Sequence, residues 1–133
     1  MTPRRLPTRS ADRAEGRGRL RVGRKYLEVA ELLRDERDES LNVCVGLAVL
    51  AGIAAADSIC AAALGERYSG ADHHAAATLL ARVDQSLGRR LSRLVGLKSE
   101  SQYGSGLLSA HDRDVALREA GALVAEAESR MAR

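Results

Sequence analysis

The chain has 133 residues and a formal net charge of +3, from 21 Lys and Arg against 18 Asp and Glu. It has no Phe or Trp and only three Tyr, so the core must come from Leu, Val, Ile and Ala, which favours helices over sheets. This composition disfavours β-sandwiches and RNA-binding sheets that stack bases on aromatic residues. Two Cys are also too few for a secreted disulfide scaffold.

The first 24 residues are strongly basic, with eight Arg against two acidic residues, a net charge of +6 that leaves −3 for the rest of the chain. Residues 1–23 combine Pro and Gly with few large apolar side chains. We therefore expect a disordered basic arm ahead of a domain spanning 24–133. The arm could attract nucleic-acid phosphates, or it could be a solubilising tail or a misassigned start. It lacks the apolar stretch of a secretory signal.

Two helices are predicted first in the domain, over residues 24–39 and 40–64. In the first, Tyr26 and the apolar residues after it recur at three- and four-residue spacing. Ser40 is the expected N-cap of the second helix, and Gly65 is its expected C-terminal stop.

The second helix raises the question of a membrane span. Residues 41–56 include no charged side chain, but these 16 positions fall short of the roughly 20 that a bilayer requires, and Asp57 interrupts the run. We therefore expect a buried helix of a soluble, cytoplasmic protein that does not bind a membrane.

Two faces of this second helix carry information. Small side chains at four-residue intervals form a ridge that lets another helix approach closely: Cys44, Ala48, Gly52, Ala56 and Cys60. A neighbouring apolar stripe leads to Asp57: Val43, Leu47, Leu50 and Ala54. A buried carboxylate needs partners or a raised pKa, so we expect an Arg, Tyr or His beside Asp57.

The two Cys lie on one helix about 24 Å apart and cannot bridge each other, so we expect reduced packing residues. Their spacing also provides no metal site.

The rest of the chain predicts further helices. Residues 66–70 form a polar connector, and Ser69 with Asp72 resembles a capping box that opens a helix over 71–86. An amphipathic helix follows from Leu87, with Arg89, Arg90 and Arg93 on its outer face. After a loop at 98–104, Ser109 and Asp112 repeat the cap signature, and a last helix runs to the C-terminus. The sequence thus predicts an all-α bundle of about five helices.

The connector and the helix after it hold the strongest candidates for catalysis. Nucleotide-binding loops, nucleophile elbows and zinc motifs are absent. Arg67 precedes His73 and His74, which begin a helix. A guanidinium and helix N–H groups can bind phosphate, while a neutral imidazole can exchange protons with a ribose 2′-hydroxyl without a metal. Adjacent His residues point about 100° apart on a helix, so only one can face a given site. Alternatively, both are simply solvated.

Other polar residues allow two interpretations. Arg89, Arg90 and Arg93 form either a solvated face or a phosphate-binding face. Tyr103 is expected to be a packing residue whose hydroxyl finds a partner. His111 is expected to be structural or solvated.

The order of these features is similar to that of the HEPN superfamily (higher eukaryotes and prokaryotes nucleotide-binding domain), particularly its small actinobacterial members. The resemblance covers about residues 25–130. It depends on the Ala-rich helix leading through Asp57 into Leu-Gly-Glu-Arg67, on Asp72-His73, and on the segment from Leu97 to Gly104 before the last helix.

The resemblance implies a helical bundle that is usually dimeric and often belongs to toxin–antitoxin or other defence systems. Active HEPN proteins are metal-independent endoribonucleases with an Arg-x4–6-His motif, which Arg67 forms here with His73 or His74. Tyr68 departs from the polar residue that commonly follows the family's arginine, and the family's motif often lies later in the bundle. Lys98 and Tyr103 match the basic-x4-Tyr element before the last helix, and Asp57 matches a polar position facing the cleft.

Two hypotheses follow. In the first, a homodimer binds or cleaves RNA without a cofactor. In its catalytic form Arg67 binds the phosphate, His73 or His74 transfers protons, Asp57 orients one of them, and Lys98 and Tyr103 contact the RNA backbone. In the second, the protein is a non-catalytic dimeric scaffold or the partner of an antitoxin-type protein, with weak nucleic-acid binding through the basic arm.

Overall fold

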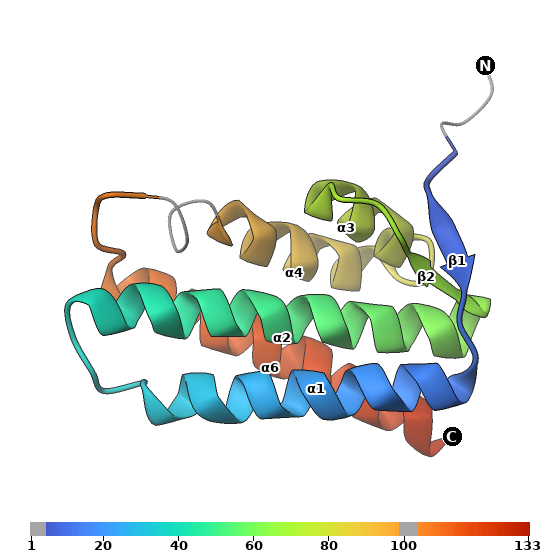
Figure 1. Ribbon diagram of the computed structural model, residues 1–133, viewed down its shortest axis with the longest axis horizontal. Helices are drawn as coiled ribbons and strands as arrows, with labels where there is room; N and C mark the ends of the chain where they lie inside the picture. Colours follow the sequence, from blue (N-terminus) through green and yellow to red (C-terminus); the bar gives the residue numbers. More distant parts are fainter. Residues whose placement is uncertain (1–4, 99–103) are drawn as a thin grey trace.

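The computed structural model describes residues 5–98 and 104–133, and these ranges hold five helices and one short two-stranded ribbon (Figure 1). The predicted all-α bundle is confirmed. In chain order the elements are β1 Thr8–Ser10, α1 Arg13–Leu32, α2 Glu39–Leu64, β2 Glu66–Tyr68, α3 His73–Ala81, α4 Gln85–Gly96 and α6 Ala110–Ala132.

Helix α2 is the central element, and the other helices surround it (Figure 1). Its ridge of small side chains is buried, and a β-carbon added at Gly52 would come within 2.4 Å of Leu94 on α4. On the α1 side, the Cys44 thiol donates a hydrogen bond to the Ala30 carbonyl at 3.2 Å. The ridge therefore allows close helix packing, as predicted, and its partners lie within this chain.

By length and composition, α2 could also cross a membrane, with a mean hydropathy of 2.1 over its most apolar window. However, 72% of that window is buried inside the bundle. A helix covered by its own chain offers little apolar surface to lipid, so the observation favours the predicted core helix.

The expected disorder of residues 1–23 is wrong for the described part, residues 5–23. Helix α1 begins at Arg13, where the Asp12 side chain accepts a hydrogen bond from the Glu15 amide at 2.8 Å. Gly16 and Gly23, which suggested flexibility, are buried instead, because α1 packs closely on α2 at both positions. The bundle thus includes residues assigned to the arm, and α1 ends at Leu32 rather than near residue 39.

The segment before α1 is also ordered, as the antiparallel partner of β2, with Arg9 opposite Arg67. The Ala11 amide donates to the Gly65 carbonyl at 3.0 Å, and the Ser69 amide donates to the Pro7 carbonyl at 3.0 Å. These bonds fix the N-terminal segment at the end of α2. The ribbon was not predicted, because three residues are too few to show a strand pattern.

Helix boundaries follow the predictions in part. Gly65 ends α2 with a left-handed backbone (φ +70°), as expected. However, α2 begins one residue before Ser40, at Glu39. Ser109 and Asp112 form the predicted capping box of α6.

The predicted helix over 71–86 is two elements. Asp72, rather than Ser69, caps α3, and its side chain accepts from the His74 amide at 3.0 Å. Helix α3 then ends at Ala81, since Asp84 caps a new helix by accepting from the Ser86 and Leu87 amides. Asp84 was read as helix interior, although it has the chemistry of an N-cap.

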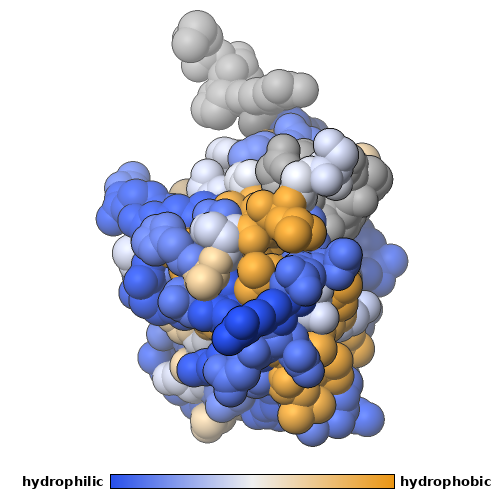
Figure 2. Space-filling model, turned by 90° about the vertical axis from the view of Figure 1, so that its left-hand side faces the viewer, coloured by the Kyte–Doolittle hydropathy of each residue, from blue (hydrophilic) through white to orange (hydrophobic). Residues whose placement is uncertain are grey.

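One face of the α1–α2 pair is not covered by residues 5–98 and 104–133. Arg19 of α1 contacts Asp57 of α2, and apolar residues continue from each of them at helical spacing along the same side. We call these residues the α1–α2 face: Val22, Tyr26, Val29, Val43, Leu47 and Leu50. All are exposed or only partly buried, with Val43 53% exposed. Figure 2 views the end of the molecule where α1 ends and α2 begins, and hydrophobic side chains gather there among charged ones.

Candidate functional site

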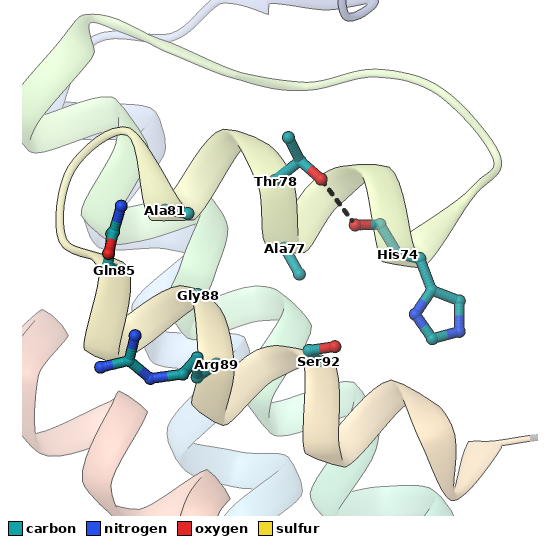
Figure 3. A pocket seen from close by; sticks show the side chains of 8 residues that line it. All are labelled: His74, Ala77, Thr78, Ala81, Gln85, Gly88, Arg89 and Ser92. Carbon is teal, nitrogen blue, oxygen red and sulfur yellow. Dashed lines mark hydrogen bonds between the residues drawn. The ribbon is translucent and has the colours of Figure 1, made fainter.

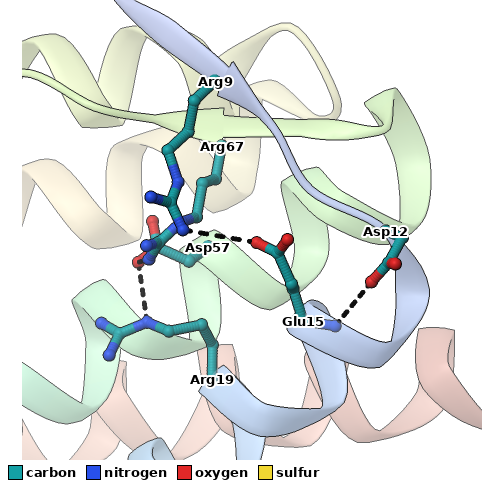
Figure 4. Close-up of polar contacts among 6 residues, drawn as sticks. All are labelled: Arg9, Asp12, Glu15, Arg19, Asp57 and Arg67. Atoms are coloured by element: carbon teal, nitrogen blue, oxygen red, sulfur yellow. Dashed lines mark hydrogen bonds and ion pairs between the residues drawn. The ribbon is translucent and has the colours of Figure 1, made fainter.

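Asp57 is the centre of the most concentrated polar cluster near the predicted site residues. It lies seven residues before the end of α2 and is only 9% exposed. Its Oδ2 accepts a hydrogen bond from Arg19 Nε at 3.0 Å and another from Arg67 Nη1 at 3.3 Å (Figure 4). The expected partner of the buried carboxylate is therefore present, as two arginines from α1 and β2.

The protonation of Asp57 reflects two opposing effects. Burial raises the pKa of its carboxyl, and the charges and hydrogen bonds of Arg19 and Arg67 lower it. Burial is the larger effect, so the pKa of Asp57 lies above its ordinary value. Asp57 is therefore easier to protonate than a surface aspartate.

The ribbon adds a third arginine to this centre. Arg9 stands opposite Arg67 in the β1–β2 pair and forms an ion pair with Glu15 at 3.4 Å (Figure 4). The three guanidinium groups face the carboxylates of Asp57 and Glu15, so the cluster has a net charge of +1. Such a centre favours an anion.

Arg67 retains unused hydrogen-bonding capacity. Its Nη1 contacts Asp57, while its Nε is buried and has no hydrogen-bond partner in the part of the chain that the structure describes. An unpaired buried N–H is costly, which makes Arg67 the member of the cluster with most to gain from a further acceptor.

His73 lies near this centre, but no hydrogen bond joins Arg67 to His73 or His74 within the described residues. His73 is half-buried at the start of α3, where burial and the positive charge of Lys98 lower its pKa more than Asp57 raises it. Its imidazole is therefore neutral at pH 7 and able to accept a proton. His74 is exposed and, unlike His73, lines two surface pockets beside α3.

Helix α3 separates two surface pockets, of about 450 and 520 Å³, and His74 and Thr78 line both. The pocket towards α4 also contains Arg89 and Ser92 (Figure 3). The pocket towards the ribbon contains Tyr68 and Arg82. The sequence pairs Arg67 with either His73 or His74, and the structure places His74 in pockets with Arg89 and Arg82.

The three arginines of α4 have different surroundings. Arg90 Nη1 and Arg93 Nη1 bind the two carboxylate oxygens of Glu119 on α6 at 3.0 and 2.9 Å. Arg89 makes no ion pair within the described residues and lines the α3–α4 pocket. All three arginines therefore keep exposed or partly exposed side chains on the outer side of α4, as predicted, while two of them also neutralise a buried acid.

Glu119 is the polar residue that the sequence reasoning missed. It is 1% exposed and also contacts Arg118 at 3.5 Å. The sequence pattern that could have predicted its burial is its position in α6. Glu119 follows Ala116 by three residues and precedes Leu123 by four, which places it on the buried face of the helix.

The basic residues of α1 divide in a similar way. Arg13 donates to three carbonyls at the C-terminal end of α6, and Arg24 pairs with Glu128 at 3.1 Å. Arg17 and Arg21 make no ion pair within the described residues. Part of the charge expected in a flexible arm, including Arg13, therefore contacts other elements of the bundle.

Among the remaining predicted site residues, Lys98 is partly buried at the end of the first described range, and Tyr103 lies outside the described residues. His111 is exposed in the first turn of α6.

Both cysteines are buried free thiols, and burial with the charges of Asp57 and Glu66 raises the pKa of Cys60 to about 12. Within the described residues, no group of three or more His, Cys, Asp or Glu could hold a metal ion.

No protein-family model matches the sequence, and no curated protein matches it.

Proposed function

We propose that this chain is an HEPN-like RNA-binding protein that acts as a homodimer in the cytoplasm and, in its catalytic form, cleaves RNA without a metal ion. The observation that supports this proposal best is the cationic centre around Asp57, where Arg67 has a buried N–H without a partner in the described residues and the charge of Asp57 reaches the neutral imidazole of His73. As in the resemblance to HEPN proteins, a toxin–antitoxin or defence role with an antitoxin-type partner belongs to the same proposal.

In the catalytic form, Arg67 binds a non-bridging oxygen of the scissile phosphate through its free donors. His73 removes the proton of the ribose 2′-hydroxyl, and the 2′-oxygen attacks phosphorus. The bond from phosphorus to the 5′-oxygen breaks, and that oxygen takes a proton from water or from a second imidazole. The products are a 2′,3′-cyclic phosphate and a 5′-hydroxyl. Asp57 positions Arg67 in this scheme.

A second candidate is a dimeric scaffold that does not catalyse. One observation favours it: the Arg67 guanidinium is already engaged by Asp57 and has no hydrogen bond to either histidine. Weak nucleic-acid binding would then come from Arg17 and Arg21 on α1, which make no ion pair with the described residues, rather than from a flexible arm.

Incubation of the purified protein with RNA in excess chelator tests the catalytic form. We expect cleavage that is lost in Arg67→Ala and in the double variant His73→Ala/His74→Ala, and unchanged in His111→Ala, a control that removes an exposed imidazole outside the centre. RNA retention without cleavage would leave the scaffold candidate. A wild-type protein that neither retains nor cleaves RNA would refute the proposal.

The α1–α2 face supports the homodimer. It combines partly exposed apolar residues from two antiparallel helices, and it ends at the Arg19–Asp57 pair. A second copy could cover this face isologously and bring two cationic centres to one interface.

Light scattering after size exclusion tests the dimer. We expect Val43→Glu with Leu47→Glu to produce monomers that still melt cooperatively. Exposed Leu107→Glu, outside this face, is the control and should leave the dimer intact. A wild-type monomer at high concentration would contradict this part of the proposal.

A further inference from the structure

Two pockets lie on either side of α3 and share part of their lining, and we call the pair the α3 groove. They share His74 and Thr78, which stand on the ridge between them, and each has a volume within the usual range for small-ligand sites. The groove runs from the ribbon across α3 to α4.

Positive charge dominates this groove. Arg82 lines one pocket and Arg89 the other, and neither makes an ion pair within the described residues. Among the described lining residues Asp72 is the only carboxylate, and its oxygen already accepts the His74 amide. A ligand with one negative charge for each pocket would match the two guanidinium groups.

The walls of the groove suit flat groups. Tyr68 lines the pocket towards the ribbon, and its hydroxyl accepts a hydrogen bond from the Asp72 amide at 3.1 Å. At Gly70 an added β-carbon would come within 2.3 Å of that hydroxyl, so the close approach of Gly70 fixes the position of the ring.

The pocket towards α4 has a floor of small residues: Ala77, Ala81 and Gly88. His74 and Arg89 stand at opposite ends of this pocket, with Ser92 between them (Figure 3). Gly88 lets α4 approach α3 closely, since an added β-carbon would lie 2.9 Å from the Ala81 α-carbon. The floor between the two helices is therefore shallow. A planar ring can therefore lie against small apolar atoms with hydrogen-bonding groups at both ends.

We propose that this α3 groove binds two consecutive nucleotides of single-stranded RNA, one in each pocket, with His74 between them. Proteins that bind single strands combine a cationic groove with flat surfaces for bases, which is the combination found here. This inference rests on the proposed RNA binding. In this proposal Arg82, Arg89 and Tyr68 contact the RNA. These contacts lie away from the Asp57 centre, because Arg67 and Tyr68 point to opposite faces of β2.

Fluorescence anisotropy with a labelled eight-nucleotide single-stranded RNA tests the groove in the full chain. We expect Arg82→Gln and Arg89→Gln each to weaken binding about 5–10-fold. In the double variant, the slope of log affinity against log salt should become shallower by about 1.4, since each lost phosphate contact removes about 0.7. Arg37→Gln is the matched control, an exposed arginine of the α1–α2 connection with no ion pair in the described residues, and it should change affinity less than twofold.

The variant Ser92→Leu tests whether RNA binding requires open space in the pocket, independently of the pocket's charge. It leaves the charge unchanged and places a bulky side chain at an exposed rim position, so binding should fall at least 5-fold while circular dichroism shows an unchanged melting temperature.

If the groove variants bind RNA as the Arg37 control does, the groove is refuted while RNA binding stands. The same conclusion follows if duplex RNA competes as well as the single strand, because the pockets take unstacked nucleotides. If the wild type binds no RNA, the proposed function falls as well.

Discussion

The buried Glu119 allows a sharp test of how this bundle is stabilised. Its carboxylate is 1% exposed, whereas Arg90 and Arg93, which bind it, are 37% and 56% exposed. The carboxylate and the two arginines therefore differ in their access to water. Removing the arginines should lower the free energy of unfolding by a different amount than removing the carboxylate.

Removing the two arginines should lower the free energy of unfolding more than removing the charge of Glu119. In Arg90→Met/Arg93→Met, Glu119 remains buried with only Arg118, whose side chain is 66% exposed and 3.5 Å away. Breaking a buried pair by removing one partner costs about 3–5 kcal/mol, because it leaves an uncompensated charge. In Glu119→Gln the arginines can turn towards water, so we expect a loss of about 1–2 kcal/mol.

Urea unfolding followed by circular dichroism measures both losses. At a slope of about 2 kcal/mol/M, a loss of about 4 kcal/mol lowers the midpoint by about 2 M. Adding Glu119→Leu to the arginine variant should recover most of the stability, since no buried charge then remains. The reasoning is refuted if Glu119→Gln is the more damaging change, or if the triple variant is no more stable than the double.

Three further outcomes are expected. Gly88→Ala should lower the free energy of unfolding by about 1–3 kcal/mol, measured in urea, because its β-carbon would meet Ala81 at 2.7 Å; an unchanged midpoint would contradict the close packing of α3 on α4. Ser109→Ala should cost about 1 kcal/mol by the same assay through loss of the capping box, whereas Ser129→Ala, at an exposed position late in α6, should cost little. The His73 imidazole should titrate below 6.5 by proton NMR. Because its pKa is lower in the folded state than in the unfolded one, it should reduce stability as the pH falls through 6.5, and a titration above that value would contradict the burial of His73.

Sequence patterns were sufficient where the structure depends on neighbouring residues. The end of α2 at Gly65 and the capping box at Ser109 were predicted because a cap is a local hydrogen-bonding arrangement. The need of Asp57 for an Arg, Tyr or His partner was likewise predictable from its position on an apolar helix. The identity of Arg19 was not, since 38 residues separate the two along the chain.

Predictions from composition were wrong where glycine serves packing. Gly16 and Gly23 weaken an isolated helix, and α1 carries a dense positive charge, so the segment suggested disorder. In the bundle these glycines let α1 lie against α2, and several arginines find partners on other elements. Only tertiary packing supplies that compensation, and no local pattern reports it.

The folded state of α1 also changes how nucleic-acid binding must be tested. Deleting residues 1–23 would remove a flexible arm cleanly if the arm existed, but here the deletion removes Arg19 and half of a core helix. Asp57 would lose a partner, and Arg67 would remain as its only arginine. Lost RNA binding in such a truncation would therefore report a damaged centre as much as a missing basic surface. Single substitutions at Arg17 and Arg21, which have no ion pair in the described residues, remove charge while leaving the buried contacts of α1 in place.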